Sequence, residues 1–141
     1  MYGCSLKHFD KYRKSIDAYA KAHRLKIRYD RRGYESSFVP SLRVIKIEPH
    51  MSDSEEIATL LHELGHSIDD MLVVNGTMSR RMDKAYKSLY KNRASKVQKA
   101  MVYGAESRAW NLGRVIAREL NIRLGKWYTS VEQFSLKTYD L

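Results

Sequence analysis

The stretch TLLHELGHSIDD (residues 59–70) decides the fold and raises the question of function. Its leucines and isoleucine recur at the spacing of one helix face, which predicts a helix in the core. Two histidines, a glutamate and a glycine interrupt that apolar run. Buried polar groups cost free energy unless they find partners, and a glycine inside a helix costs about 1 kcal/mol relative to alanine. We therefore expect a compensating interaction at this place, and a divalent metal ion would provide one.

The spacing of His62, Glu63 and His66 indicates how that ion would be held. In an α-helix, residues four apart are separated by about 40° around the axis and by one turn along it, so both imidazoles can reach one ion. Glu63 projects about 100° away from His62 and can face a metal-bound water without binding the metal. This is the H-E-x-x-H pattern, which places two zinc ligands and a general base on one rigid element. The alternative is a pair of histidines on an exposed helix face.

The sequence around this motif supports a helix in the core. Ser52 and Glu55 fit a capping box at the start of the helix, and acidic residues in the first turn match the positive end of the helix dipole. The preceding stretch LRVIKIE (42–48) alternates apolar and polar residues and is predicted to be a strand. Gly65 lies between the two histidines, which we interpret as a place where another segment approaches closely.

A catalytic zinc site needs a third protein ligand and keeps its fourth position for water. A metzincin continuation would need glycine at position 69 and a ligand at position 72, but the chain has Asp69 and Leu72 there. We therefore expect the third ligand in the stretch YGAESRAWNLGRVIAREL (103–120), where Glu106 belongs to a predicted core-facing helix. Ala109, one turn later, is small enough to let this helix approach the motif helix.

Alternatives remain for these acidic residues. Glu106 could be a surface acid paired with Arg108 or Arg114. Asp69 and Asp70 follow the second histidine by three and four residues, so they share its helix face. They could bind the metal directly, hydrogen-bond to an imidazole, or be ordinary surface carboxylates.

The two motifs together resemble a known group of enzymes. H-E-L-G-H at 62–66, followed about forty residues later by E-x-x-A-W at 106–110, is similar to the gluzincin branch of zincin metallopeptidases. It especially resembles the small minigluzincin and IrrE-like domains that are common in phage and prophage genomes. The similarity covers the predicted strand 42–48, the helix 53–72 and the helix 103–120.

The resemblance implies roles for individual residues. The zinc ligands that it implies are His62, His66 and Glu106. Glu63 would act as general base on a metal-activated water. The strand 42–48 would be the sheet edge along which a peptide substrate lies antiparallel, adding a strand to the sheet. Such enzymes often recruit a second hydrogen-bond donor for the oxyanion, and Tyr103 and Tyr128 are candidates for that role.

Hydrophobic patterns place the remaining elements. Before the motif we predict a helix at 5–23 and strands at 25–30 and 34–39. After it we predict a turn at 74–77, a helical region over 79–120 that breaks near 93–95 or at Gly104, a loop at 125–130, and a short terminal helix or tail. The chain is thus predicted to be a single α+β zincin-like domain over 1–141. It would have an N-terminal helix, a small antiparallel sheet of two or three strands, the motif helix and C-terminal helices.

Charge and composition limit the class of protein. No apolar run approaches the roughly 20 residues that cross a membrane, and no secretory signal is recognisable at the N-terminus. The single cysteine, Cys4, fits a reducing compartment, so we expect a soluble, cytoplasmic protein without membrane partners. The net charge is +10, with basic residues concentrated in 1–32 and 79–123. Such regions can lie near nucleic acid, although dispersed lysines more often only solvate helix faces.

These observations favour a zinc-dependent endopeptidase that hydrolyses peptide bonds in a protein or peptide substrate. The main alternative is a binding module that keeps the zincin scaffold with little or no turnover. Glu63 argues against that alternative, since a scaffold needs no base beside the metal. A third hypothesis is a DNA-associated protease, whose basic regions would bind phosphates with a steep salt dependence.

Overall fold

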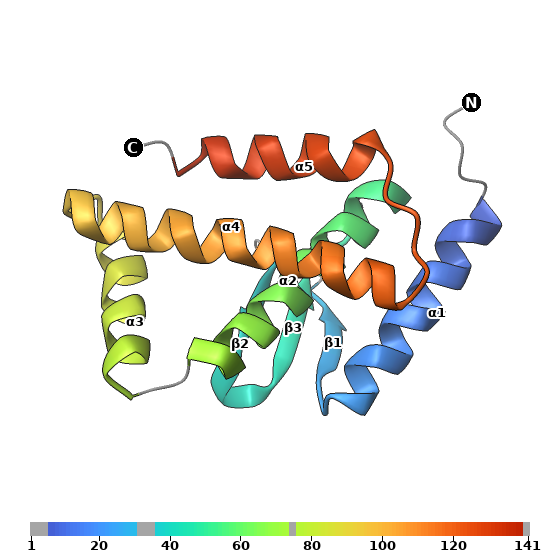
Figure 1. Ribbon diagram of the computed structural model, residues 1–141, viewed down its shortest axis with the longest axis horizontal. Helices are drawn as coiled ribbons and strands as arrows, with labels where there is room; N and C mark the ends of the chain where they lie inside the picture. The colour runs from blue at the N-terminus through green and yellow to red at the C-terminus, as the bar shows by residue number, and fades with distance from the viewer. Residues whose placement is uncertain (1–5, 31–35, 74–75, 140–141) are drawn as a thin grey trace.

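The computed structural model describes residues 6–30, 36–73 and 76–139. Within these residues the elements are α1 (Leu6–Ala22), β1 (Lys26–Tyr29), β2 (Ser37–Val39), a 3₁₀ turn (Pro40–Leu42), β3 (Val44–Ile47), α2 (Asp53–Val73), α3 (Gly76–Tyr90), α4 (Lys96–Glu119) and α5 (Lys126–Lys137). The long helix α4 crosses α2 on one side of the sheet, with α1 at one end of the molecule and α3 at the other (Figure 1). The α+β class predicted from the sequence is confirmed.

The sheet is mixed, with the strand order β1-β3-β2. β2 pairs antiparallel with β3, through Phe38 opposite Ile45, but β1 runs parallel to β3, with Lys26 opposite Val44. The prediction of an antiparallel sheet is therefore wrong for one of the two pairings. β2 and β3 are joined by a short connection and form a hairpin. β1 therefore pairs with the other side of β3, and it runs in the same direction as β3.

β3 is the central strand of this sheet and not an edge strand, which corrects the role expected for 42–48. Three of its four residues are buried, whereas β1 is mostly exposed. A strand with apolar side chains on both faces gains most from the middle position, where both faces are covered. β3 is also shorter than predicted, because Leu42 belongs to the 3₁₀ turn and Arg43 adopts a left-handed conformation with φ of 53°.

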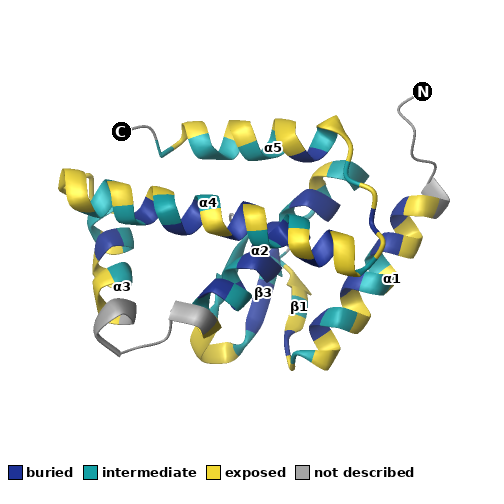
Figure 2. Ribbon diagram, viewed as in Figure 1, coloured by how far each residue is buried: buried dark blue, intermediate teal, exposed yellow. Residues whose placement is uncertain are grey.

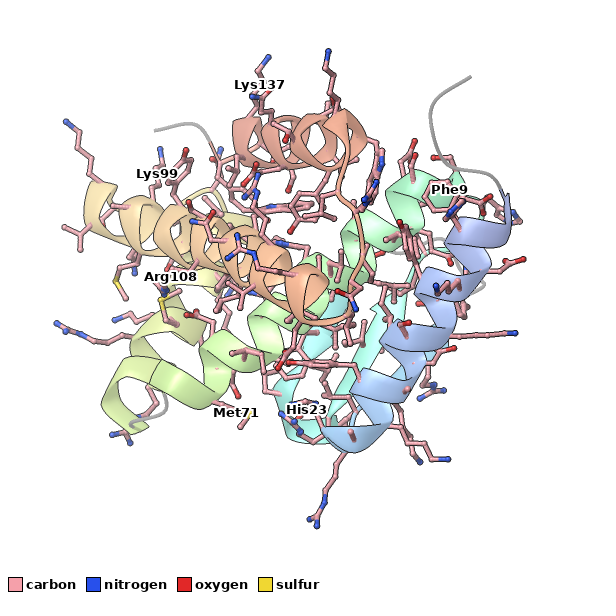
Figure 3. All side chains as sticks on the ribbon, turned by 45° about the vertical axis from the view of Figure 1, so that its right-hand side comes forward. Phe9, His23, Met71, Lys99, Arg108 and Lys137 are labelled. Carbon is pink, nitrogen blue, oxygen red and sulfur yellow. The ribbon has the colours of Figure 1, made fainter. Side chains whose placement is uncertain are left out.

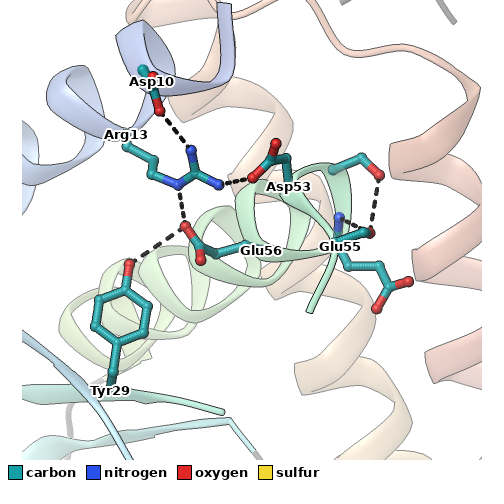
Figure 4. Close-up of polar contacts among 8 residues, drawn as sticks. Asp10, Arg13, Tyr29, Asp53, Glu55 and Glu56 are labelled. Carbon is teal, nitrogen blue, oxygen red and sulfur yellow. Dashed lines mark hydrogen bonds and ion pairs between the residues drawn. The ribbon is translucent and has the colours of Figure 1, made fainter. Parts of the chain in front are cut away.

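The start of α2 is fixed by its own cap and by α1. The Ser52 hydroxyl accepts a hydrogen bond from the Glu55 backbone N–H at 3.3 Å, which is one of the two hydrogen bonds of the predicted capping box. From α1, the Arg13 guanidinium pairs with both Asp53 and Glu56 in the first turn (Figure 4). Negative charge at a helix N-terminus is favourable, and the arginine ties that end to α1.

The apolar face of α2 lies at the centre of the core, where its side chains are almost fully buried (Figure 2). These residues are Ile57, Leu60, Leu61 and Leu64. They belong to one hydrophobic cluster that includes residues of α1, β3, α4 and α5. None of the helices among the described residues combines the length and apolar character needed to cross a membrane.

The helical region after the motif breaks at 91–95, the first of the two predicted positions, and Gly104 lies inside α4. Ser95 begins α4 with a complete capping box, in which its hydroxyl accepts from the Gln98 N–H and the Gln98 side chain accepts from the Ser95 N–H. Of the turn predicted at 74–77, residues 74–75 lie outside the described residues, and 76–77 already belong to α3.

The segment 125–130 is not the predicted loop, because α5 begins at Lys126. Gly125 adopts the extended conformation of a helix N-cap. Tyr128, in the first turn, is 1% exposed and packs edge-on against Trp110 of α4. The burial of this aromatic residue holds the first turn of α5 against the core. The polarity of the residues around Tyr128 does not indicate this tertiary contact.

Candidate metal centre

The site is formed where α2 and α4 cross at very close range. A Cβ added to Gly65 would lie 2.0 Å from the carbonyl oxygen of Ala109, so only glycine permits this approach. Gly113, one turn after Ala109, also lies against α2, because its added Cβ would be 3.0 Å from the Leu61 carbonyl oxygen. The close approach predicted from Gly65 and Ala109 is confirmed.

This crossing brings three of the predicted residues together. The Nε2 atoms of His62 and His66 lie 3.1 Å apart on α2. Glu106 of α4 places Oε1 at 3.5 Å from the His62 Nε2 and Oε2 at 2.5 Å from the His66 Nε2. Glu106 is 5% exposed, so it is not a surface acid.

His62, Glu63 and His66 form a group that could bind a metal ion, with ligand atoms within 4.8 Å of one another. Tetrahedral zinc ligands at 2.0–2.1 Å from the ion lie about 3.4 Å from each other. The separations of 3.1 Å between the imidazoles and 3.5 Å between Glu106 and His62 are close to that spacing. Glu63 is farther from the His62 Nε2, at 3.9 Å. The donor atoms therefore fit a divalent ion, and Glu106 approaches the imidazoles more closely than Glu63 does.

The two glutamates have pKa values displaced in opposite directions. Burial raises the pKa of Glu63, and the negative charge of Glu106 raises it further. The charges of His66 and His62 and a hydrogen bond with the Phe38 backbone lower this pKa, but their effect is smaller. Burial would raise the pKa of Glu106 as well. Its hydrogen bonds and charge interactions with His62 and His66 are stronger, however, and hold that pKa well below its ordinary value.

His66 is paired with Glu106 and feels the charge of Glu63. Burial lowers the pKa of its imidazole, but the hydrogen bond and charge of Glu106, together with the charges of Glu63 and Asp69, raise it to about 8. In the metal-free protein, protonated His66 is therefore a positive charge among the carboxylates of Glu106, Glu63 and Asp69. A divalent ion bound there would replace this proton with a larger positive charge.

A pocket of about 380 Å³ opens onto this group. Its walls come from β2 and the turn after it, from α2, from α3 and from α4. The residues of the motif and of α4 that line it are Glu63, His66, Asp69, Asp70, Ala105, Glu106 and Arg108. The metal group is therefore accessible from one side, and Glu63 lies on that side.

No known protein family, curated protein or solved structure matches this chain.

Asp69 and Asp70 line the pocket, but Asp69 is paired with a cation. The Arg108 Nε donates to the Asp69 Oδ1 at 2.8 Å, and Arg108 extends from α4 near α2 (Figure 3). Arg114, the other cation considered for Glu106, instead pairs with Glu132 at 2.8 Å. Asp69 is thus held by an ion pair across the helix crossing.

Tyr128 is not a donor at this site, because its hydroxyl donates to the Trp110 carbonyl oxygen at 2.6 Å in the core. Tyr103 is 37% exposed on α4 and does not belong to the pocket wall. A different tyrosine was missed: the Tyr86 hydroxyl donates to the Glu106 Oε2 at 2.8 Å. Nothing in the sequence distinguishes it among ten tyrosines, because it comes from a separate helix.

Besides Tyr86, Trp110 is a residue of the site that was not predicted from the sequence. Its ring stacks on the imidazole of His62, with centroids 4.2 Å apart and an angle of 23° between the planes. Trp110 follows Glu106 by four residues, so both side chains lie on the same face of α4. The E-x-x-A-W spacing is the sequence feature that could have indicated this contact, because it puts Trp110 on the same helix face as Glu106. The indole lies beside His62 and fixes the orientation of the His62 imidazole.

Proposed function

We propose that this protein is a zinc-dependent endopeptidase. The observation that carries the proposal is the convergence of two imidazoles and a carboxylate at ligand-like spacing, beside a second carboxylate on the wall of an open pocket. Two histidines and a carboxylate are a ligand set that suits zinc in hydrolytic enzymes. The resemblance of the two motifs to gluzincins supports the same assignment.

In this proposal His62, His66 and Glu106 hold the ion, and Glu63 moves the proton. Bound zinc lowers the pKa of a water ligand to about 7 and polarises a carbonyl group. The Glu63 carboxylate accepts a proton from the attacking water and delivers it to the amine that leaves. The raised pKa of Glu63 suits this role, because a general base works best when its pKa lies near the working pH.

The substrate would be an extended peptide that pairs with β2. β2 is an edge strand, and Ser37, Phe38 and the neighbouring Ser36 and Pro40 line the pocket. The hydrogen bond between the Phe38 backbone and Glu63 indicates that this edge lies next to the proposed base. β2 therefore replaces β3 as the strand to which a peptide could add.

The decisive experiment compares the native chain with Glu63→Gln for cleavage of a mixed peptide library and for zinc content. We expect Glu63→Gln to keep one zinc per chain and to lose at least about 100-fold in kcat/KM, the usual contribution of a general base. Glu119→Gln, the same change at an exposed residue of α4, is the control and should keep full activity. Zinc bound by the native chain without any cleavage would instead indicate a binding module.

A further inference from the structure

We propose that Tyr86 is a positioning residue of the metal centre, which holds the Glu106 carboxylate for metal binding. This inference rests on the proposed function. Its basis is the hydrogen bond that the Tyr86 hydroxyl donates to the Glu106 Oε2 at 2.8 Å. Tyr86 comes from the middle of α3, so it brings a third helix to a site whose proposed ligands lie on α2 and α4.

The Glu106 carboxylate also has polar contacts with His62 and His66. Those contacts cannot remain hydrogen bonds when a metal is present, because the Nε2 lone pairs would then bind the ion. The Tyr86 bond is different, since a phenol hydroxyl can donate to one carboxylate oxygen while the other oxygen binds a metal. It can therefore hold Glu106 in both the metal-free and the metal-loaded protein.

The two carboxylate oxygens have different surroundings. Oε2 accepts from Tyr86 and also lies 2.5 Å from the His66 Nε2, whereas Oε1 lies at the ligand-like distance of 3.5 Å from the His62 Nε2 and is free of the Tyr86 hydroxyl. A glutamate side chain has three rotatable bonds, and fixing it costs conformational entropy each time a metal binds. The Tyr86 hydroxyl removes part of that cost in advance. Groups that orient metal ligands in this way typically contribute 10–100-fold to metal affinity.

The surroundings of Tyr86 favour a fixed position. Its neighbour Ala85 is fully buried, and the hydroxyl itself is held by the hydrogen bond to Glu106. A phenol is an ordinary proton donor at neutral pH. Met82, Tyr86 and Tyr90 follow one another at helical spacing along the pocket wall, so α3 also forms one side of the proposed substrate site.

The test is Tyr86→Phe, which keeps the ring and removes only the hydroxyl. Zinc affinity is measured by competition with a chromophoric chelator, and the absorption bands of the cobalt-substituted protein report ligand geometry. We expect zinc affinity to fall 10–100-fold and the cobalt bands to shift. Tyr103→Phe, the same change at an exposed residue of α4, is the matched control and should bind zinc within about twofold of the native chain.

Tyr86→Leu provides a second hydroxyl-free variant, so that a failure of Tyr86→Phe to fold does not prevent the measurement. If a folded variant without the hydroxyl binds zinc like the native chain and gives the same cobalt spectrum, the inference is wrong, even if its kcat has fallen. In that event, zinc binding and cleavage by the native chain would leave the proposed function intact. A native chain that binds no zinc would overturn both proposals.

Discussion

Glu63 and Glu106 show how one residue type acquires two properties from its surroundings. Both are almost fully buried, yet the pKa of Glu63 is raised and that of Glu106 is lowered. The difference arises because Glu106 approaches both imidazoles within 3.5 Å, whereas Glu63 lies 3.9 Å from one of them. Two carboxylates with separated pKa values can divide the work, one as a permanent anion and the other as a group that exchanges protons.

Metal binding should depend on pH through His66. In the metal-free protein its pKa is raised from 6.5 to about 8, so the interaction with Glu106 stabilises the fold fully below pH 6.5 and is lost as the pH rises through 8. Zinc binding has the opposite dependence, because the metal must displace that proton. We expect zinc affinity to rise by up to about tenfold per pH unit below pH 8 and then to level off. Competition titrations between pH 6 and 9 measure this, and an affinity independent of pH would contradict it.

At the scale of elements, the site depends on the close crossing of α2 and α4. We expect Gly65→Ala to destabilise the protein by about 2 kcal/mol or more, because its Cβ would meet the Ala109 backbone at 2.0 Å and the helices would have to separate. Zinc affinity should fall as well, because Glu106 would move away from the histidines. Urea denaturation and zinc competition give the two values.

Gly104→Ala is the matched control for that crossing. Its Cβ would contact only the guanidinium of Arg108, at 3.3 Å, and this flexible side chain can move. Since alanine favours a helix over glycine, we expect this variant to be as stable as the native chain or more stable by up to about 1 kcal/mol. Equal losses in Gly65→Ala and Gly104→Ala would mean that the close crossing is not what holds the site together.

The elements predicted well from the sequence are those with local signals. α2 combines a capping serine, acidic residues in the first turn and an apolar stripe, so its start was predicted at the correct residue. The parallel pairing of β1 with β3 has no local signal, since a strand of four residues can pair with either neighbour. The first turn of α5 was predicted as a loop because its polar residues hide the burial of Tyr128.

At the scale of the whole molecule, the candidate site joins residues that are distant in the chain. Glu106 was expected beside His62 because it belongs to a predicted core-facing helix and because of the resemblance to gluzincins, and the structure places the two side chains 3.5 Å apart. The wall opposite them could not be predicted, because β2 and α3 reach the pocket only through the tertiary arrangement of the chain. Tyr86 and Phe38 therefore enter the site without any signature in the sequence.

Because the proposed ligands lie on two helices, metal binding and global stability should be linked. A ligand present at 1,000 times its Kd stabilises the folded state by about 4 kcal/mol, provided that the unfolded chain does not bind it. For a domain of this size that corresponds to a change in Tm on the order of 10 °C.

We expect chelation to lower the Tm of the native chain and of Glu63→Gln by this amount. Glu106→Ala should show little change, because it would lack a ligand before chelation. Calorimetry with and without chelator measures the difference, and a full shift retained in Glu106→Ala would transfer the third-ligand role to Asp69 or Asp70.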